Sequence, residues 1–298
     1  MTDSILRNPP RNKSVLVLGD NASGKTSLIA KLHGVRVPYH AFGIEYAYIN
    51  VPDKQQDDVA RLDVWILDGD PVYKKRLIFA LDDRNFSDTL VILTISMATP
   101  WMWMDQLQHW MKILTEHVAT LKIAPEEKYR CQLRLTTAWQ NYWQTIDTGS
   151  PTRGKFNAIP LPKGVLTNNL GLDVIIVVTK TDYMIALDKE YDFRSEHFAF
   201  MQQSIRRFCL MYGASLFYTS AKEGKNCDLL YQYLMHRMHG LPFRTSAQIV
   251  EKDEMLIPAG WDNTNKIAKL SMKLYTIKPN DYYNDIITKP SWSSVVKK

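Results

Sequence analysis

Short apolar runs alternate with segments of helical periodicity along most of this chain. The runs have the length and β-branched content of buried strands, and they cover residues 15–18, 45–51, 62–67, 89–95, 174–178 and 215–218. Apolar residues recur at helical spacing within 103–121, and further helices are expected from residue 25 onward and around 198–212 and 228–239. Strands that alternate with helices predict an α/β fold with a mostly parallel central sheet and helices on both faces.

The alternation stops between residues 123 and 170, where the pattern predicts an insertion. Its first part, 126–146, is expected to form an extra helix with an apolar face made of Leu135, Trp139, Tyr142, Trp143 and Ile146. Its second part, 147–164, is rich in Gly, Pro, Ser and Thr, which is typical of a surface loop.

These patterns divide the chain into three parts. We expect an N-terminal arm at 1–12, a main domain at 13–240 that includes the insertion, and a C-terminal extension at 241–298. The extension has no clean helical or strand pattern, and 257–263 and 287–292 are typical of extended chain laid over a surface. Trp261 is the expected anchor that pins the extension onto its own domain or onto a partner.

Composition narrows the functional classes. The net charge of +6 comes from scattered Lys and Arg residues without a basic run, which gives no support to nucleic-acid binding. The three cysteines are far apart and form no CxxC pair, which indicates reduced thiols in the cytosol. No apolar run is long enough for a signal peptide or a membrane span, and the seven histidines show no metal-ligand spacing.

A phosphate-binding loop follows the first predicted strand. The stretch GDNASGKTS matches the pattern GxxxxGK[ST], with a strand before it and a helix after it. Its glycines let successive backbone N–H groups face phosphate oxygens, its lysine reaches the terminal phosphates, and its threonine hydroxyl is suited to Mg²⁺. The predicted phosphate-binding residues are Gly19, Asp20, Asn21, Ala22, Ser23, Gly24, Lys25, Thr26 and Ser27.

Two further motifs, each directly after a predicted strand, indicate which base is bound. In VVTKTD, Lys180 would pack along a guanine ring and Asp182 would accept hydrogen bonds from its ring N–H and exocyclic amine. In TSAK, which includes Ser220, Ala221 and Lys222, the backbone N–H of Ala221 would reach the guanine oxygen. In this order the motifs resemble the base-reading loops of Ras-like GTP-binding proteins. We therefore expect GDP or GTP, with ADP or ATP left open.

The groups that a GTPase switch needs are missing. No Ser or Thr lies between Ser27 and Ser87, so no switch threonine can reach the metal or the terminal phosphate. The strand-end carboxylate is Asp68, which can hold Mg²⁺ through water together with Thr26. Three residues later stands Pro71, which has no N–H to contact a third phosphate, and no Gln follows nearby to orient water. We therefore expect weak or absent hydrolysis and a bound diphosphate.

Several stretches together resemble the light intermediate chains of cytoplasmic dynein, and the transport motor's type more closely than the ciliary type. The resemblance covers nearly the whole chain and is weakest at 147–163. The stretches are NKSVLVLGDNASGKTSLIAKL, GIEYAYINV, VWILDGD, VVTKTDYM, EHFAFMQQSIRRFC, ASLFYTSAKEGKNCDLLY, VEKDEMLIPAGWDN and DIITKP.

This resemblance implies a Ras-like domain in a non-catalytic motor subunit. Such a subunit docks on the dynein heavy-chain tail, and a long C-terminal arm, which we expect to be absent from these 298 residues, binds cargo adaptors. It is cytoplasmic and reaches microtubules through the motor. A scaffold need not cycle, so bound nucleotide would act as a structural ligand. A regulated GTPase switch is the main alternative, and a P-loop kinase or ATPase is a more distant one.

Overall fold

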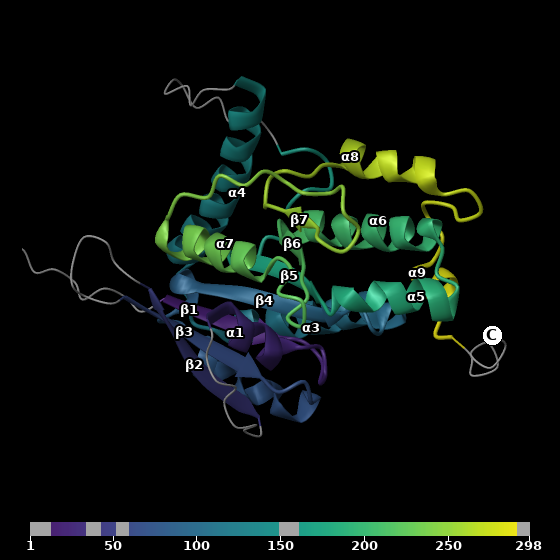
Figure 1. Cartoon of the computed structure of the whole chain (residues 1–298). Helices are drawn as coiled ribbons and strands as arrows, with labels where there is room; N and C mark the ends of the chain where they lie inside the picture. Colours follow the sequence, from purple (N-terminus) through teal and green to yellow (C-terminus); the bar gives the residue numbers. More distant parts are fainter. Residues whose placement is uncertain (1–12, 34–42, 52–59, 149–160, 291–298) are drawn as a thin grey trace, which may run out of the picture.

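A mixed sheet forms the centre of the computed structural model, which describes residues 13–33, 43–51, 60–148 and 161–290 (Figure 1). Within these residues the sheet has seven strands in the order β2-β3-β1-β4-β5-β6-β7. The strands are β1 (Lys13–Leu18), β2 (Ile44–Val51), β3 (Ala60–Leu67), β4 (Thr89–Ser96), β5 (Asp173–Thr179), β6 (Ser215–Tyr218) and β7 (Leu256–Ile257).

The five inner strands are parallel, and the two edge strands run against them. β2 pairs antiparallel with β3, and β7 pairs antiparallel with β6. β1, β4, β5 and β6 are almost entirely buried, which is why their sequences are continuous apolar runs without alternation. The expected Ras-like α/β class is thus confirmed, and β7 is the strand that the apolar pattern did not indicate.

Helices cover both faces of the sheet. The main helices are α1 (Lys25–His33), α3 (Trp103–Thr120), α4 (Pro125–Thr148), α6 (Ser195–Tyr212) and α7 (Cys227–His239). α1 and α7 pack on one face, around Leu28, Leu230 and Leu234. α3 and α6 pack on the other, where Trp103, Trp110 and Met111 are buried in the larger core. All five helices lie where the sequence predicts a helix.

The insertion forms α4, which projects from the body of the molecule in Figure 1. Leu135 and Trp139 on its apolar face are buried, as the helical pattern predicts. Trp139 packs with Val165, Leu166, Leu210 and Ile267 in a small separate core. This core joins the insertion to α6 and to the C-terminal extension. Most of the predicted loop at 147–164 lies outside the described residues.

Short elements account for most of what the periodicity missed. They are α2 (Leu77–Ala80), α5 (Met184–Tyr191), α8 (Thr264–Ala268), α9 (Tyr283–Ile286) and the 3₁₀ turns η1 (Pro71–Arg76), η2 (Phe86–Asp88), η3 (Pro100–Met102), η4 (Thr181–Tyr183) and η5 (Lys269–Lys273). One or two turns are too few to show a 3.6-residue repeat, so tertiary contacts decide these helices.

The described part of the C-terminal extension packs on the domain. Its expected extended form is wrong at 257–263, where the backbone N–H of Trp261 donates to the carbonyl of Pro258 (3.1 Å) and closes a turn. Arg206 of α6 holds Asp262 through two hydrogen bonds of 2.6 and 2.7 Å. Farther along, the ring of Tyr283 stacks on Phe200. The proposed division at residue 240 stays a prediction, as do the other boundaries, and the arm at 1–12 lies outside the described residues.

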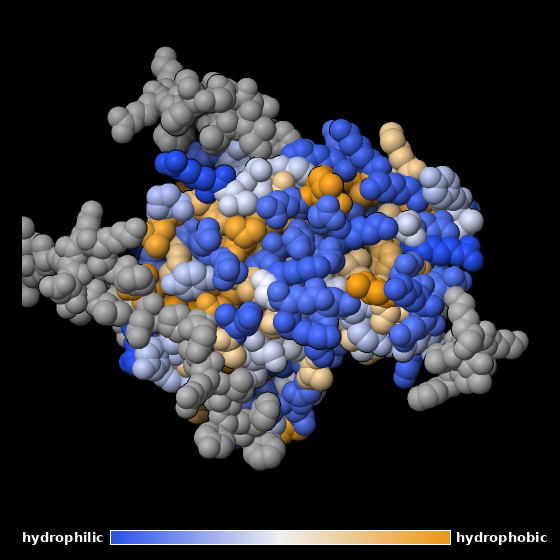
Figure 2. Space-filling view, viewed as in Figure 1, coloured by the Kyte–Doolittle hydropathy of each residue, from blue (hydrophilic) through white to orange (hydrophobic). Residues whose placement is uncertain are grey.

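The visible surface is mostly hydrophilic, and the three thiols are buried. Hydrophilic side chains predominate on the face in Figure 2, and hydrophobic side chains appear there in separate patches. Cys131, Cys209 and Cys227 are free and buried. Among the described residues, no three His, Cys, Asp or Glu side chains are grouped to hold a metal ion. The helices in this part of the chain are too short or too polar to cross a bilayer.

Candidate nucleotide site

The phosphate loop lies between β1 and α1 and requires glycine at both ends. Gly19 and Gly24 have φ angles of +145° and +91°, which side-chain-bearing residues rarely adopt. A Cβ atom at Gly19 would lie 2.4 Å from Thr94 Oγ1, so the backbone passes too close to β4 for any other residue. The hydroxyl of Ser23 is 2.8 Å from the Thr94 hydroxyl, and Thr179 donates to the Ser23 carbonyl. The loop is therefore fixed to two neighbouring strands.

The ammonium group of Lys25 is hydrogen-bonded to the backbone of the phosphate loop. Nζ donates to the carbonyls of Gly19 (2.7 Å) and Asp20 (2.8 Å). Burial lowers the pKa of Lys25 from 10.5 to about 8, although the carboxylates of Asp68, Asp20 and Glu45 partly oppose that shift. A buried cation at the mouth of a phosphate loop is suited to bind an anion, which would replace the carbonyl contacts.

Asp20, the second residue of the loop, is held by α3. Its carboxylate accepts hydrogen bonds from Trp110 Nε1 (2.7 Å) and Gln106 Nε2 (2.8 Å). These partners lie so far along the chain that no local motif indicated them. The contacts give Asp20 a structural function in addition to its place in the predicted phosphate site.

The predicted metal residues, Thr26 and Asp68, line a common cavity of about 250 Å³ with Lys25 and Glu45. Glu45, on β2, is an acidic residue of this cavity that the sequence analysis did not predict. Burial alone would raise the pKa of the Asp68 carboxyl, but hydrogen bonds from the Asp70 backbone and the Asn21 amide, among others, lower it. Asp68 is therefore ionised at neutral pH, and the donor set of one hydroxyl and carboxylates suits Mg²⁺.

A second cavity, of about 610 Å³, lies next to the phosphate loop and contains the predicted base-reading residues. Its walls include Ser27 of α1 and Lys180, Asp182, Ala221 and Lys222 from the loops after β5 and β6. Parallel strands carry their loops at the same sheet edge, which brings these distant motifs together. The cavity is large enough for a purine base beside the phosphate loop.

The two base-reading loops are joined to each other and to the phosphate loop. Lys180, whose φ is +56°, donates from Nζ to the carbonyl of Ala22 (2.8 Å), so its stem spans the cavity. Ser220 donates to Asp182 Oδ1 (2.7 Å), which orients that carboxylate. Lys222 is exposed, with its ammonium 3.9 Å from Asp182 Oδ2. Each carboxylate oxygen of Asp182 keeps a further lone pair, so both oxygens can still accept a hydrogen bond from a base.

The segment after Asp68 is already ordered by its own hydrogen bonds. Pro71 begins η1, and the Asp70 side chain caps that turn by accepting the backbone N–H of Val72 (2.9 Å). The N–H that senses a third phosphate in a switch is therefore absent at this position. The stretch 34–42, which would contain most of a first switch loop, lies outside the described residues.

A family model described as dynein light intermediate chain matches residues 3–298. The chain belongs to the dynein light intermediate chain family. It is 46% identical over 292 residues to human cytoplasmic dynein 1 light intermediate chain 1, covering 94% of this chain and 56% of the relative. It thus spans little more than half the length of that relative.

Two other comparisons place this light intermediate chain within its family. Bovine cytoplasmic dynein 2 light intermediate chain 1 is only 22% identical over 294 residues, covering 93% of this chain and 75% of the relative. The closer similarity to the dynein 1 type is as expected from the sequence. A crystal structure of the conserved domain of a dynein light intermediate chain superposes with a TM-score of 0.70 at 22% identity, covering 96% of this chain and all of that one. That structure confirms the fold.

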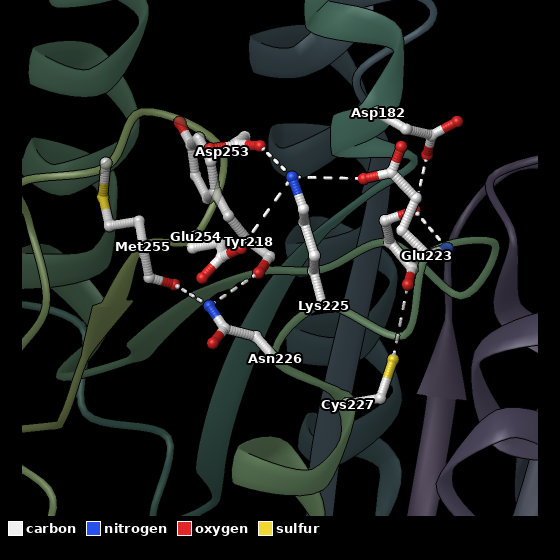
Figure 3. Close-up of polar contacts among 10 residues, drawn as sticks. Asp182, Tyr218, Glu223, Lys225, Asn226, Cys227, Asp253, Glu254 and Met255 are labelled. Carbon is white, nitrogen blue, oxygen red and sulfur yellow. Dashed lines mark hydrogen bonds and ion pairs between the residues drawn. The ribbon is translucent and has the colours of Figure 1, made fainter.

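This light intermediate chain also contains an ion cluster beside the base cavity that the motifs did not indicate. Lys225 Nζ lies 2.5 Å from Asp253, 3.1 Å from Glu223 and 3.8 Å from Glu254 (Figure 3). The next residue, Asn226, donates to the carbonyls of Tyr218 and Met255, which belong to β6 and to the residue before β7. The cluster thus joins the loop that contains Ser220, Ala221 and Lys222 to the C-terminal extension.

Proposed function

We propose that this chain is a non-catalytic subunit of the cytoplasmic dynein motor that holds a guanine nucleotide as a structural ligand. One observation carries the nucleotide part of the proposal. The phosphate loop and both base-reading loops converge on adjoining cavities, while Pro71 stands where a switch would present an N–H. Binding groups without sensing groups favour retention over turnover. Thr26 and, through water, Asp68 would hold Mg²⁺ with the phosphates.

Family membership supports the motor part of the proposal. The human relative is by name a light intermediate chain of cytoplasmic dynein. We infer that this chain docks on the heavy-chain tail and that an arm beyond the α/β domain links the motor to cargo adaptors. Such a subunit works in the cytoplasm and on microtubules. A nucleotide that binds only the folded domain would stabilise the docking unit by mass action.

The experiment captures the chain on its partner and reads out the nucleotide. The chain is co-expressed with the heavy-chain tail, the complex is purified, and the nucleotides released on denaturation are separated by chromatography. We expect about one guanosine diphosphate per chain and turnover of added triphosphate well below about 0.02 per minute, the unaided rate of a Ras-type GTPase, because the water-orienting groups are missing. Failure to capture the chain contradicts the motor part, and rapid turnover or an empty site contradicts the nucleotide part.

Asp182→Asn provides the matched control for base identity. Asparagine offers one acceptor and one donor where aspartate offers two acceptors. It therefore suits xanthine, which has an oxygen in place of the exocyclic amine of guanine. We expect the variant to lose guanosine diphosphate and to gain xanthosine diphosphate while still binding the heavy-chain tail. A variant that keeps its preference for guanine would show that Asp182 does not read the base.

A further inference from the structure

Asn21, in the phosphate loop, is hydrogen-bonded to the segment that follows β3. Its Oδ1 accepts the backbone N–H of Gly69 at 2.9 Å, and its amide also hydrogen-bonds the Asp68 carboxylate. We propose that this amide takes over the function of a third phosphate and holds the Asp68–Gly69 segment in place whatever occupies the site. The part of this proposal that concerns nucleotides rests on the function proposed above, whereas the contact between Asn21 and Gly69 does not.

The segment lies directly on the phosphate loop. A Cβ atom at Gly69 would be 2.1 Å from the backbone nitrogen of Asn21 and 2.4 Å from the carbonyl carbon of Asp20. Only glycine allows this approach, which brings the Gly69 N–H within reach of the asparagine. The preceding N–H, of Asp68, donates to the Gly43 carbonyl at 2.8 Å. The segment is therefore fixed on two sides by contacts within the chain.

A nucleotide switch works in the opposite way. Its segment is loose until the terminal phosphate accepts a backbone N–H, so that the third phosphate changes the structure. A ligand shifts a conformational equilibrium only by its differential affinity for the two states. Here the Asn21 amide oxygen accepts the N–H of Gly69, two residues before the sensing position, and we expect this contact in every state. A third phosphate has no loose segment to order, and it can reach the Gly69 N–H only by displacing that amide.

The contact between Asn21 and Gly69 acts separately from Pro71. Proline removes one donor at the sensing position, but it does not fix the residues before it. Asn21 acts on Gly69, two residues earlier, and a segment that lacked this contact would be free to respond to the phosphates through that N–H. Asp70 offers a matched comparison, because its carboxylate caps Val72 in the same segment and, among the described residues, forms no hydrogen bond with the phosphate loop.

The test follows hydrogen exchange of the Gly69 amide by NMR in the full chain. Wild-type protein is measured empty, with guanosine diphosphate, and with a triphosphate analogue that has a methylene between its last two phosphorus atoms. We expect the same protection of Gly69 within about twofold in all three states. In Asn21→Ala the empty protein should exchange about five- to tenfold faster, as loss of one hydrogen bond implies, and exchange should become nucleotide-dependent. Asp70→Ala should leave Gly69 unchanged.

Each outcome decides the proposal. The proposal is overturned if the triphosphate analogue strongly slows exchange of the Gly69 amide in wild-type protein. This comparison requires no variant. Unchanged exchange in empty Asn21→Ala, or an equal effect in Asp70→Ala, overturns the assignment to Asn21. If neither nucleotide binds, the proposed nucleotide function fails, while the comparison of the empty proteins still decides whether Asn21 fixes the segment.

Discussion

At the scale of single residues, Lys25 is placed to bind an anion. Its ammonium group is buried against two carbonyls, and burial lowers its pKa from 10.5 to about 8. The folded chain thus releases this proton at lower pH than the unfolded chain does. From about pH 8 to 10.5 the unfolded chain binds more protons, so this group makes the empty protein more stable as pH rises through that window.

Nucleotide affinity should depend on pH in the opposite direction. Phosphates beside Lys25 favour its charged form, so binding takes up a proton once the pH exceeds about 8. We expect guanosine diphosphate to bind about tenfold more weakly at pH 9 than at pH 7, as the coupled uptake of one proton implies. Isothermal titration calorimetry in buffers of different ionisation enthalpy measures both the affinity and the protons taken up.

Lys25→Met is the control for this prediction. It removes the titrating group and should bind weakly, with little change in affinity between pH 7 and 9. An equal loss of affinity over that range in the variant and in the wild type would assign the pH dependence to another group. The same result would show that Lys25 does not change its protonation on binding.

The sequence predicts residues whose chemistry is encoded locally and misses those that depend on long-range contacts. The strand, the glycines and the lysine of the phosphate loop are adjacent in the chain, so their pattern identified them. The Asp20–Trp110 and Asn21–Gly69 contacts join residues that are far apart and of common types. No periodicity or motif encodes such pairs. Only the tertiary fold, which places β3 and α3 beside the loop, brings them together.

At the scale of elements, one buried ion pair fixes the C-terminal extension to α6. Arg206 and Asp262 form two short hydrogen bonds with side chains only 2% and 7% exposed. The ring of Trp261 lies 5.8 Å from the guanidinium and 3.8 Å from the Lys266 ammonium. Removing the carboxylate would leave a buried, unpaired cation, which is far less favourable than the intact pair.

We therefore predict that Asp262→Ala lowers the free energy of unfolding by about 3–5 kcal/mol. Glu116→Ala is the control, because the Lys112–Glu116 pair is exposed on α3, and such pairs contribute at most about 1 kcal/mol. Urea denaturation followed by circular dichroism measures both. Similar losses in the two variants would mean that Arg206 finds water or another partner when Asp262 is gone.

Element prediction succeeded where a pattern repeats and failed where it does not. α3 and α6 each run through several turns, so an apolar stripe marks them. The extension instead contains helices such as α8 and α9, of five and four residues, which have no room for a repeat. Their positions follow from contacts with α6 and with the core, and residues such as Ile267 and Tyr283 are buried there. The sequence of the extension alone does not reveal those partners.

At the scale of the whole molecule, the extension completes the sheet and supports the base cavity. β7 pairs with the last parallel strand, β6, and covers an edge that would otherwise expose unpaired backbone groups. Residues of the extension, such as Met255 and Ile287, are part of the larger core. Deleting residues 241–298 would therefore expose core surface and destabilise the domain. If the shortened chain did not bind the heavy chain, that result would not identify a docking site. Single substitutions on the surface are the better probe.

Lys225 links the extension to the nucleotide because it follows the base-reading loop in sequence and contacts the extension in space. Asp253 and Glu254 hold it from the segment before β7, and Ser220 donates its backbone N–H to the Lys225 carbonyl at 3.2 Å. Ser220 in turn orients Asp182. A change at Lys225 therefore reaches the predicted base-reading carboxylate through two contacts.

We predict that Lys225→Met weakens binding of guanosine diphosphate about three- to tenfold, a coupling typical of linked sites. Lys252→Met is the matched control. Lys252 belongs to the same segment, but it contacts Ser195 on α6 and not the base-reading loop, so its loss should leave affinity unchanged.

Because coupling is reciprocal, nucleotide should slow proteolysis of residues 241–255 in the wild type more than in Lys225→Met. Equal affinity in the two variants would show that the base cavity keeps its shape without the ion cluster. The extension would then stabilise the fold independently of the nucleotide.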